Sequence, residues 1–151
     1  MNAQIKTFEA GALEGWTDFH FSIPGLPTKS KQFLKRELGL TSMEVSLNAL
    51  RVGEDMPFVH KHRENEELYL FLSGSGEFQA NGEVFPVKDG TCVKCSPEIR
   101  RTFRNTGEAE MVFIVIQAKD DSLLDHFTVH DGELVDELPK WSRSTSSDPP
   151  T

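Results

Sequence analysis

Hydrophobic and polar residues alternate in short stretches along most of the chain, and turn residues separate these stretches at close intervals. This pattern is typical of an antiparallel sandwich or barrel. It predicts strands over residues 44–52, 58–62, 67–72, 76–80, 83–87, 91–95, 101–103 and 111–118. Before them, Phe19, Phe21 and Ile23 alternate with polar residues and predict a half-buried strand that ends at Pro24-Gly25.

One helix is expected near the N-terminus, over residues 30–38. Ser30 can cap the first turn, and Gly39 follows where a left-handed residue is favourable. The apolar face of this helix would consist of Phe33, Leu34 and Leu38. We expect this face to cover part of a sheet.

The dipeptide Asn81-Gly82 is the clearest local signal in the chain, because Asn-Gly between two apolar stretches favours a two-residue type I′ hairpin. Such a loop pairs Ala80 with Glu83 and Phe78 with Phe85. It places Phe78, Ala80, Phe85 and Val87 on one face of the hairpin.

The composition limits the class of protein. A chain of 151 residues predicts one domain. The formal net charge of −8 opposes binding to nucleic acid or to an anionic bilayer. The longest apolar run, residues 111–116, is too short to span a membrane, and no secretory leader is recognisable. We therefore expect a cytoplasmic protein, and its 11 Phe residues indicate a wide apolar interior.

The candidate chemistry lies between Gly53 and Gly74. On a strand, His60 and His62 would point to the same face with their Cα atoms about 7 Å apart, so both imidazoles could reach one ion. Glu67 opens the next predicted strand after a short turn. Two imidazoles and one carboxylate suit a first-row divalent metal and form the set used by non-haem iron(II) oxygenases. A structural zinc site would require four protein ligands and no open coordination position.

A simpler interpretation applies to the two histidines, and an alternative assignment applies to the glutamate. A His-x-His pair on a strand often has no function. Glu66 and Glu67 would point to opposite faces of one strand, so only one of them can join the histidines, and a turn one residue longer than expected would exchange their roles.

The same stretch resembles the first motif of the cupin family, G-x(5)-H-x-H-x(3,4)-E-x(6)-G. Six residues rather than five separate Gly53 from His60, and the other spacings, through Glu67 to Gly74, agree. The resemblance extends over about residues 44–118. It implies an all-β fold, the cupin double-stranded β-helix or jelly-roll barrel, preceded here by a short helix. It also implies a homodimer with a metal ion inside each barrel.

Residues 82–105 are similar to the second cupin motif, G-x(5)-P-x-G-x(2)-H-x(3)-N, but depart from it in places. Gly82, Gly90 and Asn105 agree, whereas Lys88 replaces the usual proline. Arg101 stands where the family has its fourth metal ligand, a histidine. A guanidinium has no lone pair to give, so Arg101 cannot be a ligand.

The resemblance implies that His60, His62 and Glu67 are metal ligands, and Arg101 then leaves three alternatives. In the first, the three residues hold the metal and Arg101 binds a carboxylate or phosphate of the substrate. In the second, Arg101 pairs with Glu67 and replaces the metal charge. In the third, Gln117 or another residue supplies an additional ligand.

Strand parity places aromatic residues around this set. Tyr69 and Phe71 share the face of Glu67, Phe58 shares that of His60, and Phe103 shares that of Arg101. These residues are candidates for substrate binding, and Tyr69 could offer its hydroxyl. Each phenylalanine could equally belong to the barrel core.

Other reactive residues receive no role. Cys92 and Cys95 would point to opposite faces of one strand, so we expect packing rather than zinc binding, with Cys95 inside. Arg100 and Arg104 have the parity opposite to Arg101 and should be solvated. His126 and His130 lie outside the predicted strands.

The predicted organisation is an N-terminal extension over 1–43, the barrel over 44–118, a C-terminal extension over 119–142 with a helical turn at 122–126, and a disordered tail over 143–151. The predicted function is metal-dependent chemistry, of the dioxygenase (oxidoreductase) or isomerase type, on a small acidic or sugar-like metabolite. Fe²⁺ or Mn²⁺ is favoured, and Zn²⁺ or Ni²⁺ would also fit. The alternative is a non-catalytic ligand-binding or sensing protein, metal-free with Arg101 paired to Glu67.

Overall fold

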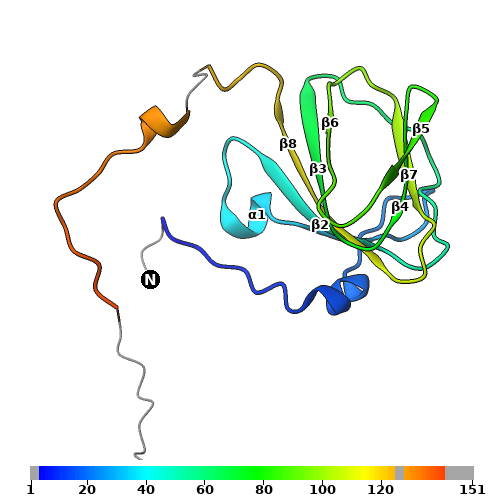
Figure 1. The fold of residues 1–151 in the computed structure, drawn as a ribbon, viewed down its shortest axis with the longest axis horizontal. Helices are drawn as coiled ribbons and strands as arrows, with labels where there is room; N and C mark the ends of the chain where they lie inside the picture. The colour runs from blue at the N-terminus through cyan, green and yellow to red at the C-terminus, as the bar shows by residue number, and fades with distance from the viewer. Residues whose placement is uncertain (1–3, 125–127, 142–151) are drawn as a thin grey trace, which may run out of the picture.

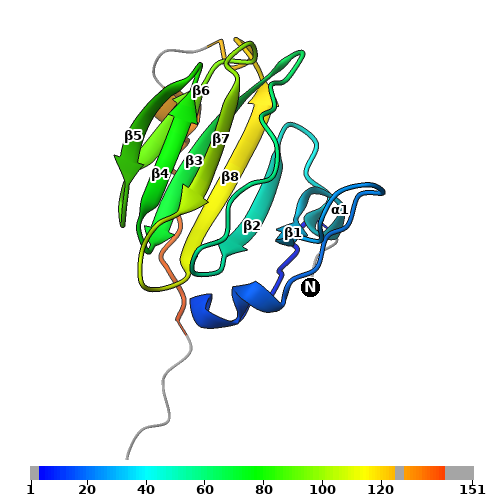
Figure 2. The same cartoon turned by 90° about the vertical axis from the view of Figure 1, so that its right-hand side faces the viewer.

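In the computed structural model, which describes residues 4–124 and 128–141, two antiparallel β-sheets pack face to face (Figures 1 and 2). The larger sheet has the strand order β1-β2-β8-β3-β6 and the smaller has the order β5-β4-β7. The elements are η1 (Leu13–Asp18), β1 (Ser30–Phe33), α1 (Lys35–Leu38), β2 (Glu44–Leu50), β3 (Asn65–Ser73), β4 (Gly76–Ala80), β5 (Glu83–Val87), β6 (Cys92–Cys95), β7 (Arg101–Asn105), β8 (Met111–Lys119) and η2 (Thr128–Asp131). The predicted all-β jelly-roll is confirmed.

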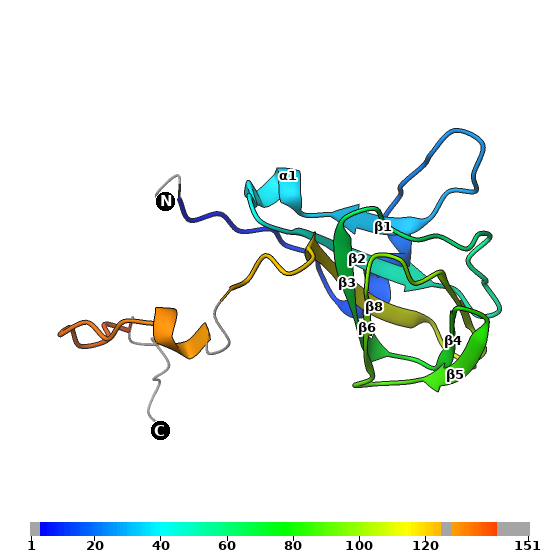
Figure 3. The same cartoon turned by 90° about the horizontal axis from the view of Figure 1, so that it is seen from above.

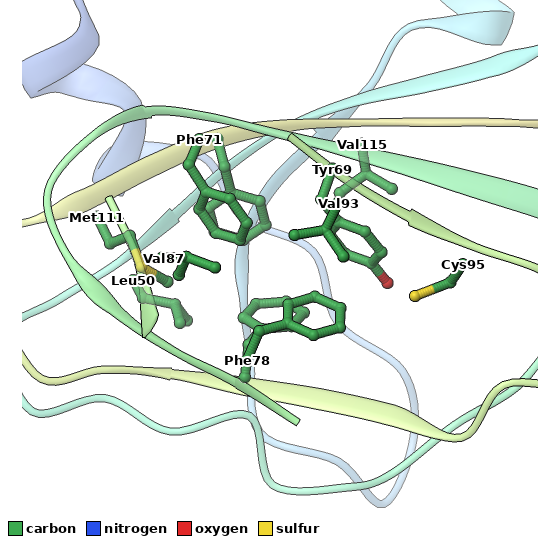
Figure 4. Packing of buried hydrophobic residues seen from close by; sticks show 11 residues of the cluster. Leu50, Tyr69, Phe71, Phe78, Val87, Val93, Cys95, Met111 and Val115 are labelled. Atoms are coloured by element: carbon green, nitrogen blue, oxygen red, sulfur yellow. The ribbon is translucent and has the colours of Figure 1, made fainter. Parts of the chain in front are cut away.

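The core lies between the two sheets and is mainly aromatic (Figure 4). The strands alternate because every second side chain points inward. Phe78 of the smaller sheet is fully buried and packs edge to face against Tyr69 of β3, with ring centroids 5.0 Å apart. Five of the 11 phenylalanines, Phe71, Phe78, Phe85, Phe103 and Phe113, therefore belong to this interior, whereas Phe8 and Phe19 pack with Trp16 in a second cluster.

The β4–β5 hairpin has the predicted register. Ala80 pairs with Glu83 and Phe78 with Phe85. Asn81 and Gly82 both have positive φ, 49° and 86°, as a type I′ turn requires. The stacked rings of Phe78 and Phe85, with centroids 5.4 Å apart, hold this register from the inner face.

The helix predicted over 30–38 is wrong for its first half. Residues Ser30–Phe33 form β1, which pairs antiparallel with β2 at the edge of the larger sheet, and only Lys35–Leu38 is helical. Ser30 does not cap a helix, because its buried hydroxyl donates to the carbonyl of Thr17. The backbone hydrogen bonds with β2 outweigh a helical preference that depended on few apolar positions. Gly39 does adopt the expected left-handed conformation.

Two predicted strands are also absent from the part of the chain that the structure describes. Residues 58–62 make only one isolated bridge, between His60 and Arg101. The ladder stops there because the facing chain turns at Ser96–Ile99, where the Ile99 amide donates to the Ser96 carbonyl. Residues 19–23 likewise make one bridge, between Phe21 and Lys29, and belong to the loop that leads to β1 (Figure 3).

Directly after β8, residues 120–124 lead away from the barrel without regular secondary structure (Figure 1). Residues 122–124 of the predicted helical turn are not helical, and the rest of that turn, together with His126 and the predicted tail 143–151, lies outside the described residues. Among the described residues, no helix is long and apolar enough to cross a membrane.

Candidate metal and ligand site

The two histidines are held beside the barrel by backbone hydrogen bonds. The His60 amide donates to the Arg101 carbonyl at 3.1 Å, and the Arg101 amide donates back to the His60 carbonyl at 2.9 Å. The His62 amide donates to the Pro97 carbonyl at 2.9 Å. The segment therefore stays extended, and both imidazoles lie on one side of it, with ring centroids 5.4 Å apart.

Glu67 completes the group from β3, which lies between β8 and β6 in the larger sheet. His60, His62 and Glu67 offer ligand atoms that all lie within 4.8 Å of one another. Nε2 of His62 lies 3.2 Å from Glu67 Oε1, and Nε2 of His60 lies 3.4 Å from it. Glu66 points away from the group and lies 3.8 Å from Lys94. The structure thus brings together the three residues that were predicted as ligands.

The carboxylate of Glu67 is buried and strongly hydrogen-bonded. Its Oε1 accepts from Tyr69 Oη at 2.8 Å, and from Arg101 Nη2 at 2.6 Å and Nε at 3.1 Å. Burial by itself would raise the pKa of this carboxyl. The contacts with His60, Arg101 and Tyr69 outweigh burial and lower the pKa to about 2. Glu67 is therefore a carboxylate at neutral pH.

Arg101 is fully buried, and its guanidinium is occupied by protein acceptors. Besides Glu67, it donates to the carbonyls of Ile99 at 2.6 Å and Pro97 at 3.3 Å. It is not among the residues that line the neighbouring cavity. The ion pair of the second alternative is present, and substrate binding by Arg101 stays a prediction.

The donor atoms at this site fit a divalent metal. Nδ1 of His60 and Nε2 of His62 are buried and have no hydrogen-bond partner among the described residues. Burial lowers the pKa of His62, in spite of the nearby Glu67 charge, and so favours the neutral imidazole that a metal requires. Within the part of the chain that the structure describes, every hydrogen bond that Glu67 accepts ends on Oε1. Its Oε2 keeps its lone pairs, so the ion pair with Arg101 does not exclude a metal.

A cavity of about 270 Å³ opens beside these residues. Phe58, Tyr69, Phe103 and Gln117 line it, as predicted from parity or position, whereas Phe71 lies in the core and does not. Gln117 also accepts a hydrogen bond from Asn65 Nδ2 at 2.9 Å. Substrate binding by the aromatic residues and metal binding by Gln117 both stay predictions.

The cavity has a second wall that the sequence analysis missed. Residues of β1 and of the loop before it line it, among them Phe21, Leu26, Lys31 and Phe33. Lys31 and Phe33 both point inward because residues two apart share a face on a strand. Residues two apart do not share a face on a helix, so the helix prediction did not indicate this wall.

The cysteines behave as expected for packing residues. Cys92 is exposed and Cys95 is buried, and both are free. Burial raises the pKa of the Cys95 thiol, which keeps it protonated on the same row of the sheet as Glu67.

Comparison with known proteins agrees with this geometry. A family model described as "Cupin domain" matches residues 47–117, which include both histidines and the glutamate. A crystal structure of a cupin protein from Bacteroides fragilis superimposes with a TM-score of 0.65 and 31% identity, and the match covers 76% of this chain and 97% of that one.

Two curated proteins match part of the chain. Polyketide synthase CurC from Streptomyces cyaneus is 35% identical over 78 residues, 50% of each chain. An oxalate-binding protein from Thermotoga maritima is 36% identical over 59 residues, which cover 38% of this chain and 48% of that protein. The chain therefore spans about half the length of these relatives.

Proposed function

Because the chain belongs to the cupin family, we propose that it binds one divalent metal ion through His60, His62 and Glu67 and acts on a small acidic or sugar-like metabolite in the adjoining cavity. The observation that carries the proposal is the convergence of three ligand-type side chains, whose ligand atoms lie within 4.8 Å of one another. His62 Nε2, buried and without a hydrogen-bond partner among the described residues, lies 3.2 Å from a carboxylate oxygen that is ionised at neutral pH, and His60 Nε2 lies 3.4 Å from the same oxygen.

The proposed metal is Fe²⁺ or Mn²⁺, and Zn²⁺ or Ni²⁺ would fit the same ligand types. Bound there, it would serve as a Lewis acid and a template for a dioxygenase or isomerase type of reaction. The chain's own part is orientation. Arg101 and Tyr69 fix the Glu67 carboxylate through Oε1, and the apolar cavity wall excludes water from the bound metabolite. The free cysteines are compatible with the cytoplasmic location included in this proposal.

The relatives support the ligand class only in general terms. The name of the Thermotoga maritima protein states that it binds oxalate, a small dicarboxylate. A small anionic ligand is therefore the class we favour for this cavity.

The second candidate function is non-catalytic binding by a metal-free barrel. The observation that favours it is the buried pair of Arg101 Nη2 and Glu67 Oε1 at 2.6 Å. In that case the guanidinium supplies the positive charge that a metal would otherwise bring.

Metal titration separates the two candidates. Metal-depleted full-length protein is titrated with Mn²⁺, and with Fe²⁺ under anaerobic conditions, by calorimetry. We expect one equivalent to bind, and His60→Ala and His62→Ala to weaken binding about 100-fold or more. His20→Ala is the matched control, since it removes an exposed imidazole outside the site. A wild-type protein that binds neither metal would refute the metal proposal and favour the ion-pair alternative.

A further inference from the structure

Lys31 lies on β1, which joins the larger sheet at its edge beside β2. It pairs with Asn48 across the two strands, and Asn48 pairs in turn with Phe113 on β8. Directly paired residues point to the same face, so this row faces the barrel interior. Lys31 and Asn48 both line the cavity that contains His60, His62 and Glu67.

The ammonium of Lys31 has a defined position. Its Nζ donates to Asn48 Oδ1 at 2.8 Å and lies 5.1 Å from the centroid of the Phe33 ring. The Asn48 amide cannot turn freely, because its Nδ2 donates to Ser46, to the carbonyl at 2.9 Å and to Oγ at 3.0 Å. Asn48 Oδ1 is therefore held toward Lys31. An ammonium has three N–H donors, and Asn48 is the only hydrogen-bond acceptor that the described residues give it.

Lys31 differs from the other cationic residues around the site in having no counter-ion. Lys29, at the same cavity, lies 3.3 Å from Glu54, and Arg101 is paired with Glu67. Among the described residues that line the cavity, only Lys31 is a cation without a carboxylate in ion-pair contact. Burial lowers the pKa of Lys31 to about 8, against the raising effect of Glu67 and Glu44, so it is still mostly charged at pH 7. A half-buried cation beside a neutral amide is costly unless an anion joins it.

We propose that Lys31 binds the anionic group, a carboxylate or a phosphate, of the metabolite whose other end lies at His60, His62 and Glu67. This inference rests on the proposed function, because it assumes that the ligand enters the same cavity. It places the residue that binds the negative charge of the substrate on β1, whereas the sequence predicted Arg101 for this role. The predicted ligand is then a bifunctional anion, in which one end chelates the metal and the other end carries a negative charge.

The test compares probe pairs that differ only in the distal charge. The carboxylate pair is 2-oxoglutarate and 2-oxopentanoate, and the phosphate pair is 3-phosphoglycerate and glycerate. Affinities are measured by calorimetry on Mn²⁺-loaded full-length wild type, Lys31→Met, Lys31→Arg and Lys88→Met. Lys88 is an exposed lysine outside the cavity, so its variant controls for net charge.

In wild type, the member that carries the distal charge should, in at least one pair, bind about tenfold or more tightly than the member that lacks it, the size expected for a charge-assisted hydrogen bond. Lys31→Met should abolish that difference and leave Mn²⁺ affinity within about twofold. Lys31→Arg should restore most of the difference, and Lys88→Met should not change it. The pair that responds distinguishes a carboxylate from a phosphate ligand. Equal discrimination in wild type and Lys31→Met, or none in wild type, would overturn the assignment.

A second measurement keeps the two proposals separable. Inorganic phosphate is titrated into metal-free wild type and metal-free Lys31→Met, and amide shifts of Lys31 and its neighbours are followed by NMR. Shifts in wild type that are lost in Lys31→Met would support the anion site even if the protein binds no metal. Identical shifts in both proteins would refute it, whatever the metal titration shows.

Discussion

Glu67 is shared between the stability of the fold and the candidate metal site. Its side chain is 5% exposed and that of Arg101 is 0% exposed, so their ion pair is screened little by water. The same carboxylate lies 3.2 Å from His62 Nε2 and 3.4 Å from His60 Nε2, measured to Oε1. A substitution at this position should therefore affect both stability and metal binding.

Glu67→Gln should lower the free energy of unfolding by about 3–5 kcal/mol at pH 7, because it leaves the Arg101 charge buried without its partner. Urea unfolding of the metal-free protein measures this effect without any contribution from a metal. Glu66→Gln is the matched control. Its ion pair with Lys94 is exposed and 3.8 Å long, so less than about 1 kcal/mol should be lost. Equal midpoints for the two variants would contradict the role of the buried pair.

The lowered pKa of Glu67 predicts a specific loss of stability in acid. Because the folded-state pKa, about 2, is below the ordinary value of 4.5, ionised Glu67 stabilises the fold above pH 4.5. This contribution, about 3 kcal/mol, is lost as the pH falls from 4.5 toward 2. Urea unfolding of metal-free wild type and Glu67→Gln between pH 7 and pH 3 should show a gap that narrows below pH 4.5. A constant gap would mean that Glu67 is not the titrating group.

Turns between strands place strict demands on single positions. Gly74, the last residue of the first motif, joins β3 to β4 with a φ of 93°. A Cβ there would lie 2.5 Å from the Glu110 carbonyl oxygen and 2.8 Å from Met111 Cα, both backbone atoms that cannot move aside. Gly82 also has positive φ, but a Cβ there would meet nothing within 4 Å.

Gly82→Ala should therefore cost only the left-handed strain, about 1–2 kcal/mol. Gly74→Ala adds a backbone collision to a similar strain and should cost at least about 2 kcal/mol more. Urea unfolding of the two variants measures the difference. Similar losses at the two positions would show that the β3–β4 turn relaxes, and that the motif glycine is not required by this close approach.

Most strands could be predicted because apolar inward side chains and polar outward side chains alternate along each strand, and this alternation is visible in the local sequence. The register of β4 and β5 follows from two residues, Asn81 and Gly82, whose backbone preference is intrinsic. The segment 30–38 could not be assigned correctly, because its apolar spacing suits either a helix or a strand. Pairing with β2, which lies later in the chain, decides between the two.

The candidate site also contains both residues that the local sequence predicts and residues that only the folded chain brings together. His60, His62 and Glu67 are close in sequence, so their spacing predicts that they meet. The partners of Arg101 also involve Ile99 and Pro97, whose carbonyls turn toward it only in the folded loop. Lys31 reaches the cavity through strand pairing alone, and no local spacing reveals that contact.

In the whole molecule, the barrel is followed by a segment, residues 128–141, whose large apolar side chains are mostly exposed to the solvent among the described residues. Leu134 is 101% exposed and Trp141 is 85% exposed. Such side chains lose exposed apolar area when another chain covers them. The homodimer stays a prediction, and we place its contact at this segment.

The expected mass in solution is twice the 17.0 kDa of one chain, measured by light scattering over a range of concentrations. Trp141→Asp should shift the protein toward the monomer, because it places a charge in the proposed contact. Val84→Asp, on the exposed face of β5, should leave the mass unchanged. A monomeric wild type at every concentration would contradict the homodimer.

The cavity combines residues inside and outside the range that the family model matches. His60, His62 and Glu67 lie within residues 47–117, whereas Lys31, Phe33 and the loop before β1 lie outside that range. If Lys31 binds the distal anion as proposed, exchange of residues 21–33 between cupins should change which anion binds and leave the metal site unchanged. The substrate of a relative that matches only the barrel therefore does not indicate the substrate of this chain.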